Sequence, residues 1–256
     1  QRFPRRDGAA GYPPPPHAAG IELVICVEVV FMRYSPQFVI ENGVLLYYQG
    51  PVTSVTIPDG VTAIGSEVFR FYEKLTKVRF PQSLTSIGER AFCGCIRLAN
   101  LQFPDSLQSI GKDAFFNCPK LTELQFPDTL TSIGEGAFEE CTKLSQVHLP
   151  DNISYIGEGA FRNCFKLSHI SIPDGVSSIA PYTFCDCGNL QDLHLPQTLT
   201  EIGKSAFNEC TKLTSLSLPD GIVSIGEGAF ASCKSLRSVH IPDSVSSISE
   251  FAFSRC

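Results

Sequence analysis

The chain lacks a long apolar segment. Its longest apolar run, IELVICVEVVFM at residues 21–32, is only twelve residues long and is interrupted by Glu22 and Glu28. A helix needs about 20 consecutive apolar residues to cross a bilayer. The run therefore predicts a strand, and we expect no transmembrane segment.

Positive charge is also scarce. The chain has 20 Lys and Arg against 26 Asp and Glu, and its formal net charge is −6. Nucleic acids and anionic membranes are bound by clustered positive surface, so no nucleic-acid partner is expected. The apolar content of 43% is enough for a real core, in one large domain or two small ones.

No recognisable targeting segment opens the sequence. Residues 1–20 form a Pro/Gly-rich tail with Arg2, Arg5, Arg6 and four prolines at 13–16, and they resemble neither a secretory signal nor a transit peptide. The first residue is not Met. We therefore expect the chain to be mature or cropped, which leaves secretion open.

A 23-residue repeat fills most of the chain. SIGEGAFEEC (132–141), YIGEGAFRNC (155–164) and SIGEGAFASC (224–233) are near copies of one phrase. An active site occurs once, not nine times, and the phrase lacks the third glycine of a dinucleotide loop. It is interpreted as a structural repeat. The units begin at Val52, Leu75, Leu98, Leu121, Leu144, Leu167, Leu190, Leu213 and Leu236.

Each unit predicts a strand, a turn and a second wall. Apolar side chains at positions 4 and 6 point inward, positions 3 and 5 point outward, and Pro at position 7 ends the strand. Ile at position 13 and Phe at position 18 occur in all nine units and line the opposite wall. Units stacked about 4.8 Å apart bury these side chains as continuous ladders. The predicted fold is a β-rich repeat solenoid.

Two local features of the unit need their own explanation. Position 14 is nearly always Gly, because a Cβ there would either crowd the next coil or forbid a positive φ. The sixth unit departs from the pattern with Ala180-Pro181 and Thr183, so its outer turn is expected to be displaced.

The unit Leu-x-x-Leu-x-Phe-Pro-Asp-x-Leu-x-x-Ile-Gly-x-x-Ala-Phe-x-x-Cys resembles the BspA-type leucine-rich repeat over residues 52–256. The resemblance implies a right-handed leucine-rich repeat horseshoe that serves as a binding scaffold, often on cell surfaces, with no catalytic residues. Residues 21–51 are expected to be N-terminal cap strands and a hairpin, since FVIENGVLLYYQG (38–50) resembles the hairpin before the first repeat. Asn42-Gly43 supplies its tight turn.

The cysteines predict a buried ladder of free thiols. Eight of the eleven occupy position 21, and stacked side chains run parallel instead of converging into disulfides. The pairs Cys93/Cys95 and Cys185/Cys187 are four coils apart, so they cannot share one zinc ion. Separate weak sites remain an alternative, but Cys93 and Cys185 are expected to be extra surface cysteines. Neither a metal nor another cofactor is predicted.

The outward positions 3 and 5 form a polar face with no aromatic residue. Four of the five histidines lie there, and His169 is expected beside Asp192 on the next strand. The cluster is interpreted as solvated imidazoles, with a metal or pH-sensing site as the alternative. The candidate binding residues of this face are Lys77, Arg79, Gln102, Glu123, Gln125, Gln146, His148, His169, Asp192, His194 and His240.

Two charged rows are predicted at the edges of this face. Asp105, Asp128, Asp151 and Asp174 occupy position 8 of four successive units. The rows are interpreted as solvated turn charges or as binding sites, the basic one for an acidic partner or a sulfated glycan. The candidate basic rim is position 23 of five successive units: Lys74, Arg97, Lys120, Lys143 and Lys166.

These observations predict a non-enzymatic scaffold that binds a macromolecule, most readily a protein, through its polar concave sheet. The alternative is a structural subunit packed permanently in a larger assembly. Self-association is expected through an open edge after the last unit, which ends at Cys256 without a polar cap. The resemblance favours a cell-surface or extracellular location, whereas free thiols favour an intracellular one.

Overall fold

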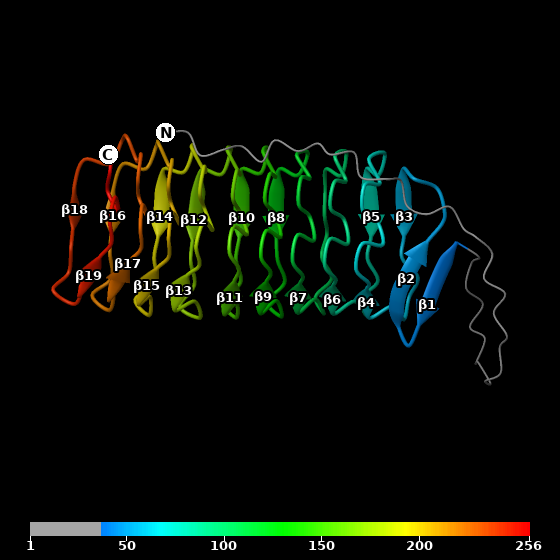
Figure 1. The fold of residues 1–256 in the computed structure, drawn as a ribbon. Helices are drawn as coiled ribbons and strands as arrows, with labels where there is room; N and C mark the ends of the chain where they lie inside the picture. The colour runs from blue at the N-terminus through cyan, green and yellow to red at the C-terminus, as the bar shows by residue number, and fades with distance from the viewer. Residues whose placement is uncertain (1–36) are drawn as a thin grey trace. The chain divides into compact units, whose positions relative to one another are not determined.

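A computed structural model describes residues 37–256. The predicted tail at 1–20 and the strand predicted at 21–32 lie outside these residues. Each predicted unit forms one coil, and the coils are stacked in chain order (Figure 1). Residues 37–256 contain strands and turns and no helix. The predicted repeat solenoid is confirmed.

A hairpin precedes the first coil, as predicted. Strands β1 (Phe38–Glu41) and β2 (Val44–Tyr48) pair antiparallel. Asn42 and Gly43 between them both have positive φ, 50° and 80°, as a tight hairpin turn requires. Strand β2 then pairs in parallel with the first coil. The ring of Tyr48 lies 5.3 Å from that of Phe69, so the hairpin closes one end of the core.

The first strand of each coil begins at repeat position 3 or 4 and ends at position 5. These strands pair two by two, parallel and in register, so equivalent positions of paired coils are neighbours. The third coil differs from the prediction, because it makes only one bridge, between Asn100 and Lys77. The strands are β3 (Ser54–Thr56), β5 (Lys77–Arg79), β8 (Glu123–Gln125), β10 (Gln146–His148), β12 (His169–Ser171), β14 (Asp192–His194), β16 (Leu216–Ser217) and β18 (Val239–His240).

The second wall is itself a parallel sheet of two-residue strands, each ending at the Ile of position 13. They divide into a seven-stranded sheet that starts at the hairpin and runs to β11, and a four-stranded sheet from β13 to β19. The strands are β4 (Ala63–Ile64), β6 (Ser86–Ile87), β7 (Ser109–Ile110), β9 (Ser132–Ile133), β11 (Tyr155–Ile156), β13 (Ser178–Ile179), β15 (Glu201–Ile202), β17 (Ser224–Ile225) and β19 (Ser247–Ile248).

The outer turn carries a third ladder of backbone hydrogen bonds. The amide of Phe138 donates to the carbonyl of Ala160 in the next coil, and the amide of Phe115 donates to Ala137 in the same way. Positions 16 and 20 have positive φ in all nine coils, although most of their residues are not glycine, as at Asn163 and Glu209. The turn therefore satisfies its backbone groups across coils without forming a strand.

Of the two explanations for Gly at position 14, the structure supports crowding. A Cβ on Gly157 would lie 2.5 Å from the backbone nitrogen of Glu135, and one on Gly134 would lie 2.7 Å from that of Lys112. These glycines do not have positive φ. Positive φ falls instead two residues later, at position 16.

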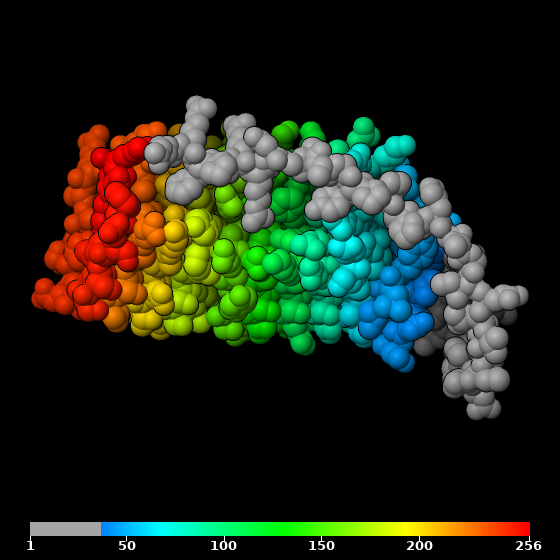
Figure 2. Space-filling view, viewed as in Figure 1, coloured from blue at the N-terminus to red at the C-terminus, as the bar shows by residue number. Residues whose placement is uncertain are grey.

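The core lies between the first strands, the second wall and the outer turns, and it consists of stacked side chains. The phenylalanine rings at position 18 are parallel neighbours: Phe92 and Phe115 are 5.1 Å apart at 2°, and Phe161 and Phe184 are 5.6 Å apart at 2°. The space-filling view shows the coils in contact along the stack, in chain order from blue to red (Figure 2). A 23-residue unit thus buries its apolar face only against its neighbours.

The prediction of a displaced outer turn in the sixth coil is wrong. Its turn keeps the ladder, since the amide of Gly159 donates to Pro181 and that of Phe161 to Thr183. The irregularity lies just before the turn, where β11 and β13 are not paired. This break coincides with Ala180-Pro181 at positions 14 and 15, since a residue that precedes a proline is restricted in its backbone conformation. A Cβ at position 14 alone does not break the pairing, because Ser249 donates its amide to Ile225 as the glycines do in the regular coils.

Candidate binding surfaces

The outward side chains of the first strands form one polar surface, which we call the strand face. It comprises positions 3 and 5 of the coils. The register places Gln125 beside His148 and Gln146 beside Glu123. All eleven residues predicted for this face are exposed. Within residues 37–256, none of the eleven forms a side-chain hydrogen bond or an ion pair with another residue.

Three of the four strand-face histidines, His148, His169 and His194, lie in successive coils. His169 is the register partner of Asp192, as predicted, and Ser171 is the partner of His194. The rings of His169 and His194 lie 5.5 Å apart at 62°. Among the described residues, no group of three or more His, Cys, Asp or Glu could hold a metal ion. The arrangement is a pair of neighbouring exposed imidazoles.

The basic rim is exposed along its whole length. Lys74, Arg97, Lys120, Lys143 and Lys166 occupy the same position in five successive coils. No ion pair of the described region includes any of these five cations. They contribute an unneutralised row of charge at one edge of the strand face.

The acidic rim is longer than the four aspartates considered above. Position 8 is also Asp in the first, eighth and ninth coils, at Asp59, Asp220 and Asp243, and all seven are exposed. The only exceptions are Gln82 and Gln197. The two rims are therefore opposite in charge.

A second set of charges, on the outer turn, was missed by the sequence reasoning. Lys112 Nζ lies 2.8 Å from Glu135 Oε1, and this hydrogen bond raises the pKa of Lys112. Lys204 makes the same contact with Glu227 at 2.7 Å. Each pair joins residues 23 apart, so the spacing of opposite charges at position 15 was the available signal. Unlike the rim cations, these two lysines are neutralised by carboxylates of the next coil.

The thiols at position 21 are buried and bonded across coils. Cys95 Sγ donates to the carbonyl of Phe69 at 3.1 Å, and Cys141 Sγ donates to Phe115 at 3.5 Å. Burial raises the pKa of Cys141 to about 12. The predicted thiol ladder is confirmed over Cys95 to Cys233, whereas Cys256 is exposed. The ladder stabilises the stack and offers no reactive thiolate.

The prediction that Cys93 and Cys185 are surface cysteines is wrong. Their exposed fractions are 5% and 4%. The thiol of Cys185 contacts Asp186 Oδ2 at 3.3 Å and receives a weak hydrogen bond from Asn208 at 3.9 Å. Neighbouring side chains of the outer turn therefore cover the Cys185 thiol.

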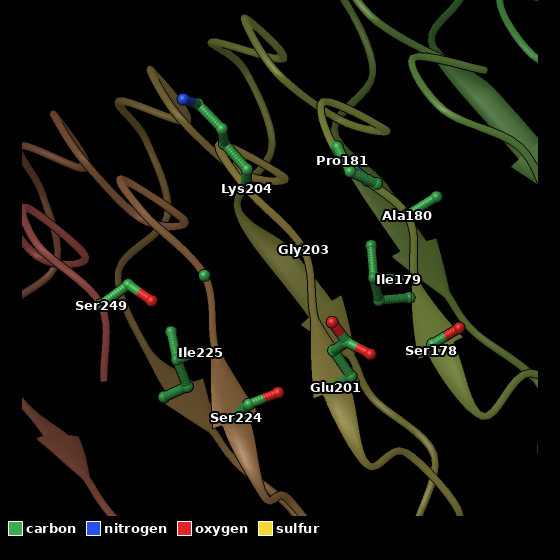
Figure 3. A pocket seen from close by; sticks show the side chains of 11 residues that line it. Ser178, Ile179, Ala180, Pro181, Glu201, Gly203, Lys204, Ser224, Ile225 and Ser249 are labelled. Atoms are coloured by element: carbon green, nitrogen blue, oxygen red, sulfur yellow. The ribbon is translucent and has the colours of Figure 1, made fainter. Parts of the chain in front are cut away.

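A shallow hollow lies along β13, β15 and β17 (Figure 3). Ser178, Glu201 and Ser224 are on adjacent strands at its floor, and the side chain of Lys204 extends away from them. Because Lys204 is paired with Glu227, its charge is not directed at this hollow. The lining groups do not converge on a common point.

Comparison with known proteins identifies the repeat. The profile of the BspA type Leucine rich repeat region (6 copies) matches residues 42–168 and 154–256. The chain belongs to the BspA-type leucine-rich repeat family. Among the curated proteins compared, none matches the chain.

Solved structures of leucine-rich repeat proteins are similar to this BspA-type chain. The Leucine Rich Repeat protein of T. pallidum is 32% identical, with a TM-score of 0.65 over 69% of this chain and 87% of that one. A leucine rich cell surface protein from Faecalibacterium prausnitzii is 24% identical, with a TM-score of 0.47 over 86% of this chain and 85% of that one. No membrane-crossing helix is found in residues 37–256.

Proposed function

We propose that this chain is a non-enzymatic repeat scaffold that binds a protein partner through the strand face. Residues 52–256 form the scaffold, and the hairpin within 21–51 caps it. The observation that carries the proposal is that the strand-face side chains are not used in hydrogen bonds or ion pairs within the described residues. These polar side chains are exposed, whereas charges on the outer turn pair with each other.

The backbone beneath the strand face favours a binding role. The side chains between the outward ones, such as Leu124 and Val147, are buried in the core. The outward groups are therefore held on rigid strands at regular spacing, which lowers the ordering cost when a partner binds. A non-enzymatic role is supported by the thiols, since their burial raises their pKa and the histidines lie on the exposed face.

Substitution of adjacent strand-face residues tests the proposal. We expect Gln125→Ala/Gln146→Ala/His148→Ala on β8 and β10 to weaken retention of a protein partner crosslinked and purified from the native source. The melting temperature should not change, because these side chains make no internal bonds. Direct binding of the purified partner is the measurement.

The matched control is Ser109→Ala/Ser132→Ala on β7 and β9, which alters polar side chains of neighbouring coils on the other sheet. Partner binding that survives the strand-face substitutions and is lost in the control would contradict the proposed role of the strand face.

A further inference from the structure

Two sets of cations on the repeats have different surroundings. On the outer turn, Arg90, Lys112 and Lys204 each have a carboxylate within 3.1 Å in a neighbouring coil. On the basic rim, Lys74, Arg97, Lys120, Lys143 and Lys166 have none within 4.0 Å in residues 37–256. The rim charges are therefore available to an external anion.

The rim has the geometry of a line, not of a pocket. Its five cations follow one another coil by coil, at a spacing of about 4.8 Å. At the first coils, two further exposed cations, Lys77 and Arg79, extend it onto β5, where Lys77 is the register partner of Asn100. A ligand that neutralises this row needs negative charges along an extended chain, about one for each coil.

Large exposed apolar side chains accompany the row in two of its five coils. Position 22 directly precedes the rim cation, and it holds Ile96 beside Arg97 and Phe165 beside Lys166. Both side chains are exposed, by 37% and 45%. An exposed ring next to a cation provides a surface for the apolar face of a sugar ring, while the ammonium group contacts its anionic substituent.

We propose that the basic rim, extended by Lys77 and Arg79, binds a linear sulfated polysaccharide. A nucleic-acid duplex presents phosphates over a broad surface that would also meet the acidic remainder of this chain, whose net charge is −6, whereas a single polysaccharide chain is narrow enough to contact the row alone. Sulfate groups remain ionised and can supply about one charge per sugar, which a chain with a single carboxylate per disaccharide does not. This site adjoins the strand face and shares Lys77 and Arg79 with it, whereas the five rim cations lie outside the strand face.

Heparin is the probe, and Lys143→Gln/Lys166→Gln is the test variant. We expect its affinity for heparin to fall roughly tenfold or more, and the slope of log affinity against log salt to become shallower by about two, one for each lost contact. The matched control is Gln82→Asp/Gln197→Asp on the opposite rim. It changes the net charge by the same two units, and Asp already occupies that position in the other coils.

A fall of equal size in both variants would overturn the proposal, because it would show an effect of net charge alone. No binding of heparin by the unmodified chain, or equal binding of a DNA duplex and heparin, would overturn it as well.

Phe165→Thr tests for the sugar chain itself, since Thr occupies the same position at Thr142 and Thr211. Weaker heparin binding with an unchanged salt slope supports a sugar chain on the rim, and unaltered binding contradicts it. None of these measurements uses the protein partner, so the polysaccharide site and the strand-face function can fail separately.

Discussion

At the residue scale, the position-21 cysteines combine two properties that other small side chains lack together. The thiol is apolar enough to be buried, and it is still a weak donor. Cys164 and Cys187 each use it to bond a phenylalanine carbonyl of the preceding coil, at 3.4 Å and 3.3 Å. Alanine would leave that bond unmade, and serine would bury a more polar group.

Alkaline pH should destabilise the fold through these thiols. Burial raises the pKa of Cys141 from 9.0 to about 12, so between these values the folded chain holds a proton that the unfolded chain has lost. Stability is full below pH 9.0 and falls as pH rises toward the folded pKa. Urea unfolding measured across this window should show the fall. The free energy of unfolding of a Cys141→Ala variant should fall less between neutral and alkaline pH than that of the unmodified chain. An identical fall would show that the Cys141 thiol does not cause the pH dependence.

Phe161 tests the ring ladder at the same scale. It is fully buried between Phe138 and Phe184, with centroid distances of 5.6 Å on both sides. We expect Phe161→Ala to lower the free energy of unfolding by about 3–5 kcal/mol, because neighbouring coils cannot collapse into the void. The exposed Phe165→Ala is the control and should change it by only about 0.5 kcal/mol or less. Similar unfolding curves for the two variants would show that Phe161 does not support the core.

At the scale of the element, close approach between successive coils limits what position 14 can hold. Gly157→Ala should destabilise the chain by about 1–3 kcal/mol, since the new Cβ meets the Glu135 backbone, which cannot move without disturbing the ladder. Gly188→Ala is the control, because the nearest atom to its Cβ would be 3.7 Å away. Thermal unfolding of both variants checks this. Equal melting temperatures would mean that the coils have room for a methyl group.

At the scale of the whole molecule, the solenoid is a sum of neighbouring contacts. Deletion of residues 121–143 removes one complete coil, and the remaining coils keep every ladder in register. We expect this shortened chain to fold with a similar circular dichroism spectrum and somewhat lower stability. Deletion of residues 121–142 removes one residue fewer and offsets every later side chain by one position, so it should not form the same stack. Equal folding of both deletions would contradict the ladder description.

Much of the architecture was predictable because the repeat multiplies weak local signals. Nine copies made the coil length, the inward positions and the strand-ending proline readable from one sequence. The hairpin turn at Asn42-Gly43 was predicted from residues that tolerate positive φ. Exposure of the strand-face residues also followed from alternation, and that of the rim residues from their place in turns, whereas the role of both in binding stays a prediction.

Taken alone, the sequence determined the stacking unit and the family, since both depend on periodic residue types within 23 positions. Contacts between coils were decided only by the tertiary structure. They include the crowding at Gly157, the burial of Cys93, the ion pair of Lys112 with Glu135 and the unpaired strands beside Ala180. Each depends on how closely two backbones approach, a distance that no pattern within one unit specifies. At that spacing the outer-turn lysines meet carboxylates of the next coil, whereas each rim cation has another cation at the equivalent position of the neighbouring coil.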